Sequence, residues 1–228
     1  MNDFISTLKE YSKMLQSCAV WQDSGDILAP VFSDKDNSVA NDCYIYEFYC
    51  YVSIIVDLKN IYEIRFKEGK GKTKYKFPQA AANKAGKPHF LAFKNNQLEF
   101  QICAGTRIDS VVESEDNHPD ISFQAPDASD NPTHEDLIAI MDAKFKENEN
   151  ETLPKAEVYK FATIIDLFEL RGGLKKEIEF YRFKGLEGNC LITNGKSYSN
   201  PSDVKLLNKY SMKEVENFSP GKKFNIIG

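Results

Sequence analysis

The segment HPDISFQAPDASDNPTHEDLIAIMDAKFK spans residues 118–146 and holds two apolar runs, each attached to an aspartate. Asp120 stands directly before the first run, and Asp142 closes the second one in the sequence LIAIMDAK. Because side chains alternate between the two faces of a strand, Asp142 and Lys144 are expected on the same face. If the two strands are neighbours in one sheet, both carboxylates converge at its rim. The segment therefore predicts two strands with a polar site at their ends.

Paired carboxylates at such a rim are oxygen ligands for a hard divalent ion. Mg²⁺ is the preferred ion, because it keeps several waters and accepts phosphate oxygens, and Mn²⁺ is expected to substitute. The backbone carbonyl of Ala143 is a natural additional ligand. Lys144 would stand beside the metal as a cation, where it stabilises charge on a phosphate or helps to deprotonate an attacking water. These residues predict metal-dependent chemistry on a phosphate ester.

The rest of the chain predicts a mixed α/β fold, with a central sheet flanked by helices. Helical spacing is typical of residues 3–17 and of the strongly apolar residues 41–58, with Asn41 or Asp42 as N-cap. A further helix is expected after Pro154, stopping at Gly172-Gly173, and a terminal helix over 202–218, capped by Ser202 or Asp203. The expected strands are 62–66, a hairpin over 89–104 turning at Asn95-Asn96, the two strands above, IEFYRF (178–183), NCLITNG (189–195) and KKFNIIG (222–228).

Composition limits the class of protein. The chain has 228 residues, 42% of them hydrophobic, and a net charge of −5. No apolar run approaches the length of a membrane span, and the N-terminus is unlike a signal peptide, so we expect no membrane partner. Five scattered cysteines favour reduced thiols in a cytoplasmic protein.

A nucleic-acid partner would have to meet a local basic face, because the field of the whole molecule opposes it. The densest positive stretch is the Gly-rich segment that begins near residue 67. A lysine-rich loop is by default a solvated surface, but in a nuclease it would contact phosphates. Its candidate DNA-contacting residues are Lys70, Lys72, Lys74, Lys76, Lys84 and Lys87.

The residues PD at 119–120 and DAK at 142–144 resemble the signature of the PD-(D/E)xK phosphodiesterase superfamily. A helix follows the Asp-x-Lys strand, as in that superfamily, and offers Glu157 and Lys160 as accessory polar residues. Upstream, YIYEFYCYVSII places Glu47 in a helix similar to the Tyr-Glu-aromatic-aromatic helix of nuclease domains in bacterial restriction systems.

This resemblance implies a restriction-endonuclease-like fold with an αβββαβ core over residues 41–195. Residues 1–40 would be a helical extension, and residues 196–228 a C-terminal helix and edge strand packed on the core. The implied activity is Mg²⁺-dependent endonucleolytic cleavage of DNA, in bacterial restriction or phage defence. Glu47, Asp120, Asp142 and Ala143 would bind the metal, and Lys144 would assist an in-line attack of water.

Other interpretations stay open at this point. Glu47 could be a solvent-facing residue or a satisfied core carboxylate. His118 could be a catalytic base, but a loop histidine beside a proline is more often solvated. The same fold could act as a catalytically silent or partner-dependent module that binds nucleic acid or protein. Cutting both strands would suit a homodimer, and a separate targeting or regulatory subunit would fit the acidic charge. In an unrelated α/β enzyme, Asp120, Asp142 and Lys144 would not converge.

Overall fold

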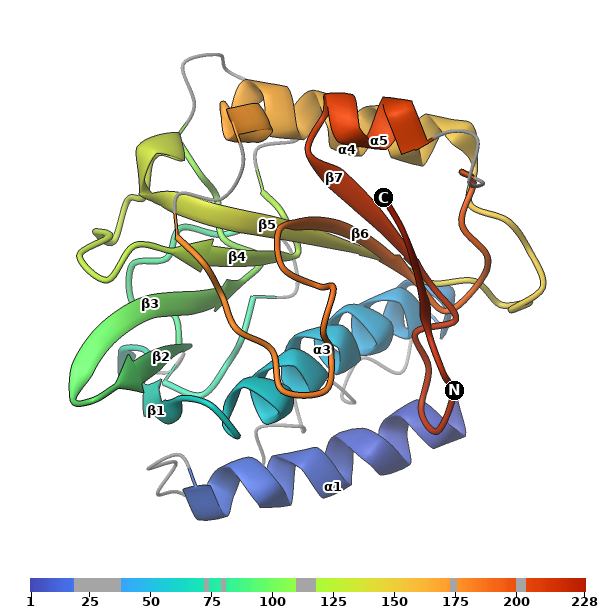
Figure 1. The fold of residues 1–228 in the computed structure, drawn as a ribbon. Helices are drawn as coiled ribbons and strands as arrows, with labels where there is room; N and C mark the ends of the chain where they lie inside the picture. Colours follow the sequence, from blue (N-terminus) through green and yellow to red (C-terminus); the bar gives the residue numbers. More distant parts are fainter. Residues whose placement is uncertain (19–37, 72–73, 79–80, 110–117, 173–175, 200–203) are drawn as a thin grey trace.

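The fold is taken from a computed structural model, which describes residues 1–18, 38–71, 74–78, 81–109, 118–172, 176–199 and 204–228. One eight-stranded sheet in the described part of the chain carries its strands in sequence order (Figure 1). The expected mixed α/β sheet with flanking helices is confirmed. Its strands are β1 (Glu63–Lys67), β2 (His89–Lys94), β3 (Gln97–Ala104), β4 (Ile121–Gln124), β5 (Leu137–Lys144), β6 (Asn189–Thr193), β7 (Met212–Glu216) and β8 (Asn225–Ile227).

The direction of pairing changes at β5. Strands β1 to β5 are antiparallel neighbours, β5, β6 and β7 are parallel, and β8 returns antiparallel to β7. Parallel neighbours need a crossover connection, and helix α4 (Lys155–Leu167) supplies it between β5 and β6. The long strand β5 therefore lies where the meander meets the parallel half of the sheet.

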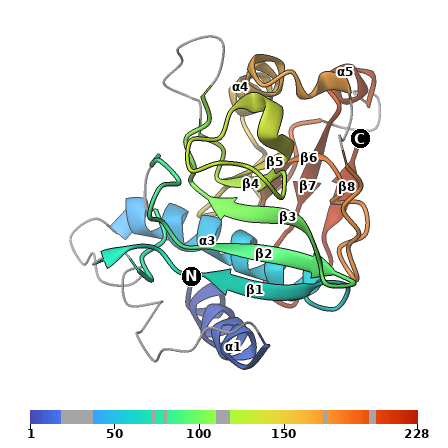
Figure 2. The same cartoon turned by 90° about the vertical axis from the view of Figure 1, so that its left-hand side faces the viewer.

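Helices cover both faces of the sheet (Figure 1). Helix α3 (Ser38–Leu58) lies against one face with α1 (Asn2–Cys18) packed beneath it, as Figure 2 also shows. Helix α4 and the short α5 (Val204–Lys209) cover the other face. Short 3₁₀ turns occupy His134–Asp136 and Leu170–Gly172. No helix in the described ranges is long and apolar enough to cross a membrane.

Each face of the sheet carries its own apolar core, and β5 contributes to both. Met141 and Ala143 belong to the core under α3, whereas Ile140 packs in the core under α4. The alternation of a strand then places Asp142 and Lys144 with Ile140, on the side of α4. Their expected common face is confirmed.

The hairpin over 89–104 is confirmed, with β2 and β3 joined at Asn95 and Asn96. Both turn residues adopt positive φ values, 53° and 63°. A tight hairpin turn of this kind needs left-handed backbone at both positions, and asparagine tolerates it better than most residues. The turn chemistry alone was sufficient to locate this element.

Two predicted helix ends are wrong. Helix α3 begins at Ser38, so Asn41 and Asp42 lie inside it and neither is its N-cap. Helix α4 ends at Leu167, before the expected stop at Gly172-Gly173. Gly173 and the expected caps Ser202 and Asp203 lie outside the described residues.

The predicted strand over 178–183 is wrong, because that segment joins no ladder. Its backbone N–H groups bond to side chains instead. Those of Tyr181 and Arg182 donate to the carboxylate of Asp57 at 2.8 and 2.9 Å, and that of Glu179 donates to the hydroxyl of Tyr62 at 3.0 Å. The apolar alternation reflects two buried residues, Ile178 and Phe180, on an irregular segment.

The predicted terminal helix over 202–218 is also wrong beyond its first turns. Helix α5 ends at Lys209, and Ser211 turns the chain with a φ of 49°. Residues Met212–Glu216 then pair with β6 as strand β7. The C-terminal segment therefore supplies two strands of the sheet, β7 and the expected edge strand β8.

Candidate metal and active site

Strand pairing brings the Pro-Asp and Asp-Ala-Lys residues together. Ile121 on β4 lies opposite Met141 on β5, so Asp120 precedes β4 beside the end of β5. The carbonyl of Asp120 accepts a bond of 2.9 Å from the N–H of Gly105, at the end of β3. This bond fixes the backbone that carries the carboxylate.

The side chains make direct contacts at this point. The N–H of Ala143 donates to Asp120 Oδ2 at 2.7 Å, and Lys144 Nζ lies 2.7 Å from Asp142 Oδ2. The carboxyl group of Asp142 is also close enough to that of Asp120 to raise its pKa. The interpretation of an unrelated enzyme expected Asp120, Asp142 and Lys144 to lie apart, and on that point it is wrong.

The neighbouring strand β6 holds this end of β5 rigidly. Thr193 Oγ1 donates to the carbonyl of Lys144 at 2.8 Å. Asn194 brackets Lys146, accepting from its N–H at 2.7 Å and donating to its carbonyl at 2.8 Å. Paired on both sides, the strand end presents Asp142 and Lys144 from a support with little freedom to move.

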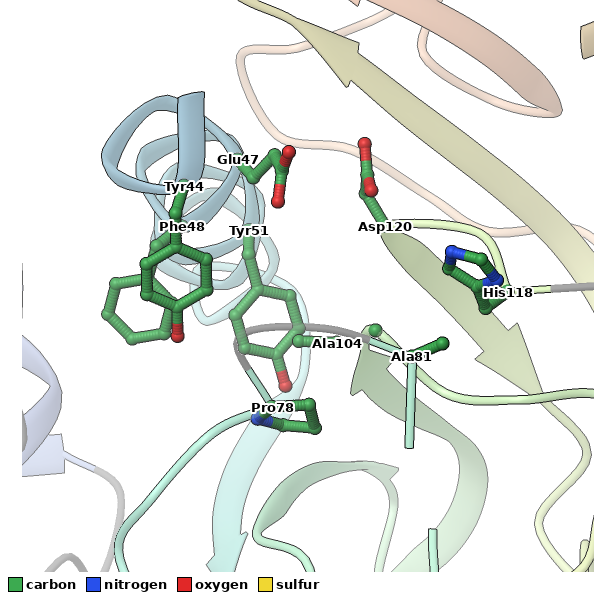
Figure 3. Close-up of a pocket in the computed structure, with 10 residues that line it drawn as sticks. Tyr44, Glu47, Phe48, Tyr51, Pro78, Ala81, Ala104, His118 and Asp120 are labelled. Atoms are coloured by element: carbon green, nitrogen blue, oxygen red, sulfur yellow. The ribbon is translucent and has the colours of Figure 1, made fainter. Parts of the chain in front are cut away.

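Glu47 reaches the same place from α3. Figure 3 shows its carboxylate and that of Asp120 facing each other across the mouth of a pocket of about 190 Å³. The rings of Tyr44, Phe48 and Tyr51 form the α3 wall of this pocket. Glu47 is therefore half-buried, at the rim of this pocket.

Burial and neighbouring charges shift the pKa values of the carboxyl groups in different directions. Burial, followed by the negative charges of Asp142 and Glu47, raises the pKa of Asp120 well above its usual value. Burial acts in the same direction on Asp142, but the Lys144 ammonium and the neighbouring Asp120 carboxyl group hold the pKa of Asp142 below its usual value. The pKa values of the two aspartates are therefore shifted in opposite directions.

Glu47 and Lys144 respond to the same cluster. Burial, and then the charge of Asp142, raise the pKa of Glu47 to about 7. Burial acts to lower the pKa of Lys144, but Asp142 and Asp120 outweigh it and raise that pKa. Lys144 is consequently a cation beside three carboxyl groups.

The donor chemistry fits a hard divalent cation. Within the described ranges, no group of three or more His, Cys, Asp or Glu side chains is arranged so that it could hold an ion as it stands. Ionisation of one of two neighbouring buried carboxyl groups, however, opposes ionisation of the other unless a cation lies beside them. A divalent ion supplies that charge, and oxygen atoms are the ligands it prefers. Asp120, Asp142 and Glu47 are the side chains that could supply oxygen ligands to such an ion.

The two accessory candidates on α4 lie near the cluster. Glu157 Oε2 is 3.7 Å from Lys144 Nζ, so the ammonium stands between Asp142 and Glu157. Lys160 is exposed, and its positive charge helps to lower the pKa of Asp142. Both residues therefore act on the Asp142–Lys144 pair.

The basic segment is divided by the structure. Lys70 and Lys76 are exposed, Lys87 is half-buried, and Lys74 pairs with Glu68 at 2.9 Å. Lys84 is only 3% exposed, and its ammonium donates to the carbonyls of Ala128 and Ser129. The expectation that Lys84 contacts DNA is therefore corrected, since its charge is used inside the protein. Lys72 lies outside the described residues.

Sequence reasoning missed the aromatic part of the site. Tyr44, Glu47, Phe48 and Tyr51 are spaced at i, i+3, i+4 and i+7, which places them on one helix face. That spacing could have linked the rings to the carboxylate. His118 is half-buried and lines the same pocket.

No protein-family model matches this chain, and no significant match to it is found among curated proteins or solved structures. The function of the site is therefore inferred from its own residues and their geometry.

Proposed function

We propose that this protein is a divalent-metal-dependent endonuclease that hydrolyses DNA phosphodiester bonds. The observation that carries the proposal is that Asp120 bonds to the strand end that carries the ion pair of Asp142 and Lys144. The carboxylate of Glu47 faces that of Asp120 (Figure 3). The resemblance of PD and DAK to the PD-(D/E)xK superfamily supports the same chemistry. It also suggests that α3, β3 to β5, α4 and β6 are the counterpart of that superfamily's αβββαβ core.

Glu47, Asp120 and Asp142 would hold Mg²⁺ or Mn²⁺, with the carbonyl of Ala143 as a further proposed ligand. When bound, the ion would polarise a phosphate oxygen and lower the pKa of a water molecule. The carboxyl groups of the chain position that charge, and the N–H of Ala143 fixes the orientation of Asp120.

Lys144 would stabilise the charge that develops on the phosphate. Its ammonium is ion-paired with Asp142, and 27% of its side chain is exposed, so a substrate oxygen can reach it. In the hydrolysis, a water oxygen forms a bond to phosphorus while the bond to the leaving oxygen breaks. Stabilising charge in the transition state, rather than in the bound substrate, is what accelerates such a step.

The substrate would be held partly by the basic segment, whose exposed Lys70 and Lys76 offset the acidic total charge. We place the activity in bacterial restriction or phage defence in the cytoplasm, on the resemblance alone. A homodimer, or a separate targeting or regulatory subunit, is part of the same proposal.

A cleavage panel tests the proposal. The substrates are supercoiled plasmid, linear duplex, single-stranded DNA and RNA, each with Mg²⁺, Mn²⁺ or EDTA. We expect metal-dependent cleavage that Asp142→Ala or Lys144→Ala reduces on the order of a thousandfold or more. Asp142→Ala removes a proposed metal ligand, and Lys144→Ala removes the cation that would stabilise the reacting phosphate.

Asp127→Ala is the matched control, because it removes a carboxylate that is exposed on the loop between β4 and β5. It should cut like the unmodified protein. Cleavage that persists in an Asp142→Ala/Lys144→Ala double variant contradicts the assignment. Absence of cleavage under every condition would favour the partner-dependent or catalytically silent binding module.

A further inference from the structure

The pocket beside the carboxylates has an aromatic wall that metal and phosphate chemistry leaves unexplained. Glu47 and Asp120 form part of its rim, so a group seated in it would touch the proposed metal ligands. Phosphate oxygens and hydrated ions gain little from contact with the faces of aromatic rings. The wall therefore indicates a second, apolar part of the substrate.

The rings of that wall are held in place by packing. Tyr44 and Phe48 stack with their centroids 6.1 Å apart and their planes 25° from parallel. Phe48 also packs on Phe77, at 5.2 Å. The hydroxyl of Tyr51 donates to the carbonyl of Ile102 at 2.8 Å, which fixes a ring that is only 1% exposed at the base of the wall. A preformed wall of this kind binds without first paying the entropy of ordering.

The opposite side of the pocket carries polar groups. Figure 3 shows the imidazole of His118 beside Asp120, across the pocket from Tyr44 and Phe48. Its Nδ1 is buried and has no hydrogen-bond partner among the residues that the structure describes. A buried polar atom left unpaired is costly, and such atoms often mark a ligand site. The pocket thus offers stacking on one side and an unsatisfied hydrogen-bonding group on the other.

The size of the pocket limits what fits. Its volume of about 190 Å³ is below the roughly 300–1,000 Å³ of pockets that enclose drug-sized molecules. One planar ring system fits this space better than a whole nucleotide or a larger ligand. A nucleobase combines apolar faces with a polar edge, which matches the two walls.

We propose that this pocket binds one unpaired nucleobase of the strand being cut, next to the scissile phosphate. The inference rests on the proposed nuclease function and names its substrate class, which is single-stranded or locally unpaired nucleic acid. In an intact duplex the faces of a base are covered by its neighbours. Such a base reaches a side pocket only after it is unstacked and turned out of the helix.

A binding measurement tests the pocket separately from cleavage. A single-stranded oligodeoxynucleotide carrying one fluorescent adenine analogue is titrated with the protein in Ca²⁺, which takes the same kind of oxygen ligands as Mg²⁺. We expect the fluorescence to change as the analogue enters the pocket. An intact duplex of the same sequence should compete poorly, and a duplex with one mismatched pair should compete better. A single-stranded RNA competitor shows whether the pocket distinguishes the two sugars.

Tyr44 offers a matched pair of variants. Tyr44→Leu removes the stacking ring and should weaken binding about tenfold, because stacking on an aromatic side chain is a large part of single-strand binding. Tyr44→Phe keeps the ring and should bind like the unmodified protein. Tyr181→Leu, at a tyrosine that is 55% exposed and outside the pocket, should also bind normally.

The two proposals fail in different ways. Equal competition by the intact duplex, or equal binding by Tyr44→Leu and Tyr44→Phe, overturns the nucleobase pocket even if metal-dependent cleavage is found. A fluorescence change that depends on the Tyr44 ring supports the pocket, even if no substrate is cut and the nuclease proposal is lost.

Discussion

At the scale of single residues, the site contains buried charged groups, each of which would be costly to bury without a partner of opposite charge. Asp142 is 7% exposed and lies against both Asp120 and Lys144. A buried carboxylate of this kind requires a partner, and the Lys144 ammonium, 2.7 Å away, is that partner. Shifted pKa values caused by burial and close charges are common at sites that bind an ion or a substrate.

Unlike Asp142, which is buried beside an opposite charge, His89 is buried as a neutral ring. It is 3% exposed, its Nδ1 lies 3.3 Å from the carbonyl of Lys87, and its Nε2 has no partner in the described ranges. Burial, followed by the positive charges of Lys84 and Lys67, lowers the pKa of His89 from 6.5 to about 4, whereas Asp130 acts weakly in the other direction.

This burial predicts a pH-dependent loss of stability. The unfolded chain binds the His89 proton first, so this contribution to stability is complete above pH 6.5 and is lost as the pH falls to about 4. The total loss is roughly 3 kcal/mol. In His89→Asn, the free energy of unfolding, measured in urea at a series of pH values, should fall by that much less between pH 6.5 and about 4. Parallel pH profiles for both proteins would contradict the prediction.

At the scale of elements, helix α3 both forms the site and organises the chain behind it. Its middle turns present Tyr44, Glu47 and Phe48 to the pocket. Its last turn presents Asp57, which is fully buried and accepts the N–H groups of Tyr181, Arg182 and Phe183. Arg182 Nε is 3.6 Å from the same carboxylate, but its side chain is 58% exposed and adds little.

Asp57→Ala should therefore lower the free energy of unfolding by about 3 kcal/mol, because it leaves buried N–H groups without their charged acceptor. Asp57→Asn keeps one acceptor oxygen and should cost about half as much. Urea unfolding measures both, and limited proteolysis should show faster cutting within 176–183. Asp3→Ala, at an exposed acid of α1, is the control. Equal stability of Asp57→Ala and Asp3→Ala would show that the carboxylate does not hold the segment.

At the scale of the whole molecule, a net charge of −5 and a cluster of carboxyl groups make cations general stabilisers of the fold. The specific effect of a bound ion must be separated from that background. An ion that binds only the folded state adds about 2.7 kcal/mol at a concentration one hundred times its Kd.

Mg²⁺ or Mn²⁺ should accordingly raise the Tm by several degrees, on the order of 5 °C for a chain of this size. Differential scanning fluorimetry with and without EDTA measures the shift. The double variant Asp120→Asn/Asp142→Asn should abolish the shift in Tm, because it removes two carboxyl groups of the proposed donor set. Asp127→Asn/Asp130→Asn removes the same charge from exposed positions and should keep it. The same shift in both double variants would indicate nonspecific screening.

Local sequence signals located most elements, because they act over a few residues. Asn95-Asn96 specified a hairpin, the run 137–144 a buried strand, and Pro154 the start of α4. The errors lie where a distant partner decides the outcome. Residues 178–183 alternate like a strand but bond to Asp57, more than a hundred positions away in the chain. Residues 212–216 have a helical composition but pair with β6.

The order of the expected helices and strands was enough to predict the mixed α/β class. The period of two in a strand was enough to place Asp142 and Lys144 on a common face. Only the tertiary structure decided that Asp120 and Glu47 meet that pair, that Lys84 turns inward, and that the rings of α3 line a pocket beside the carboxyl groups. The physical reason is that strand pairing and helix packing join segments far apart in the chain. The energies of burial and like charge depend on those distances, which local spacing does not contain.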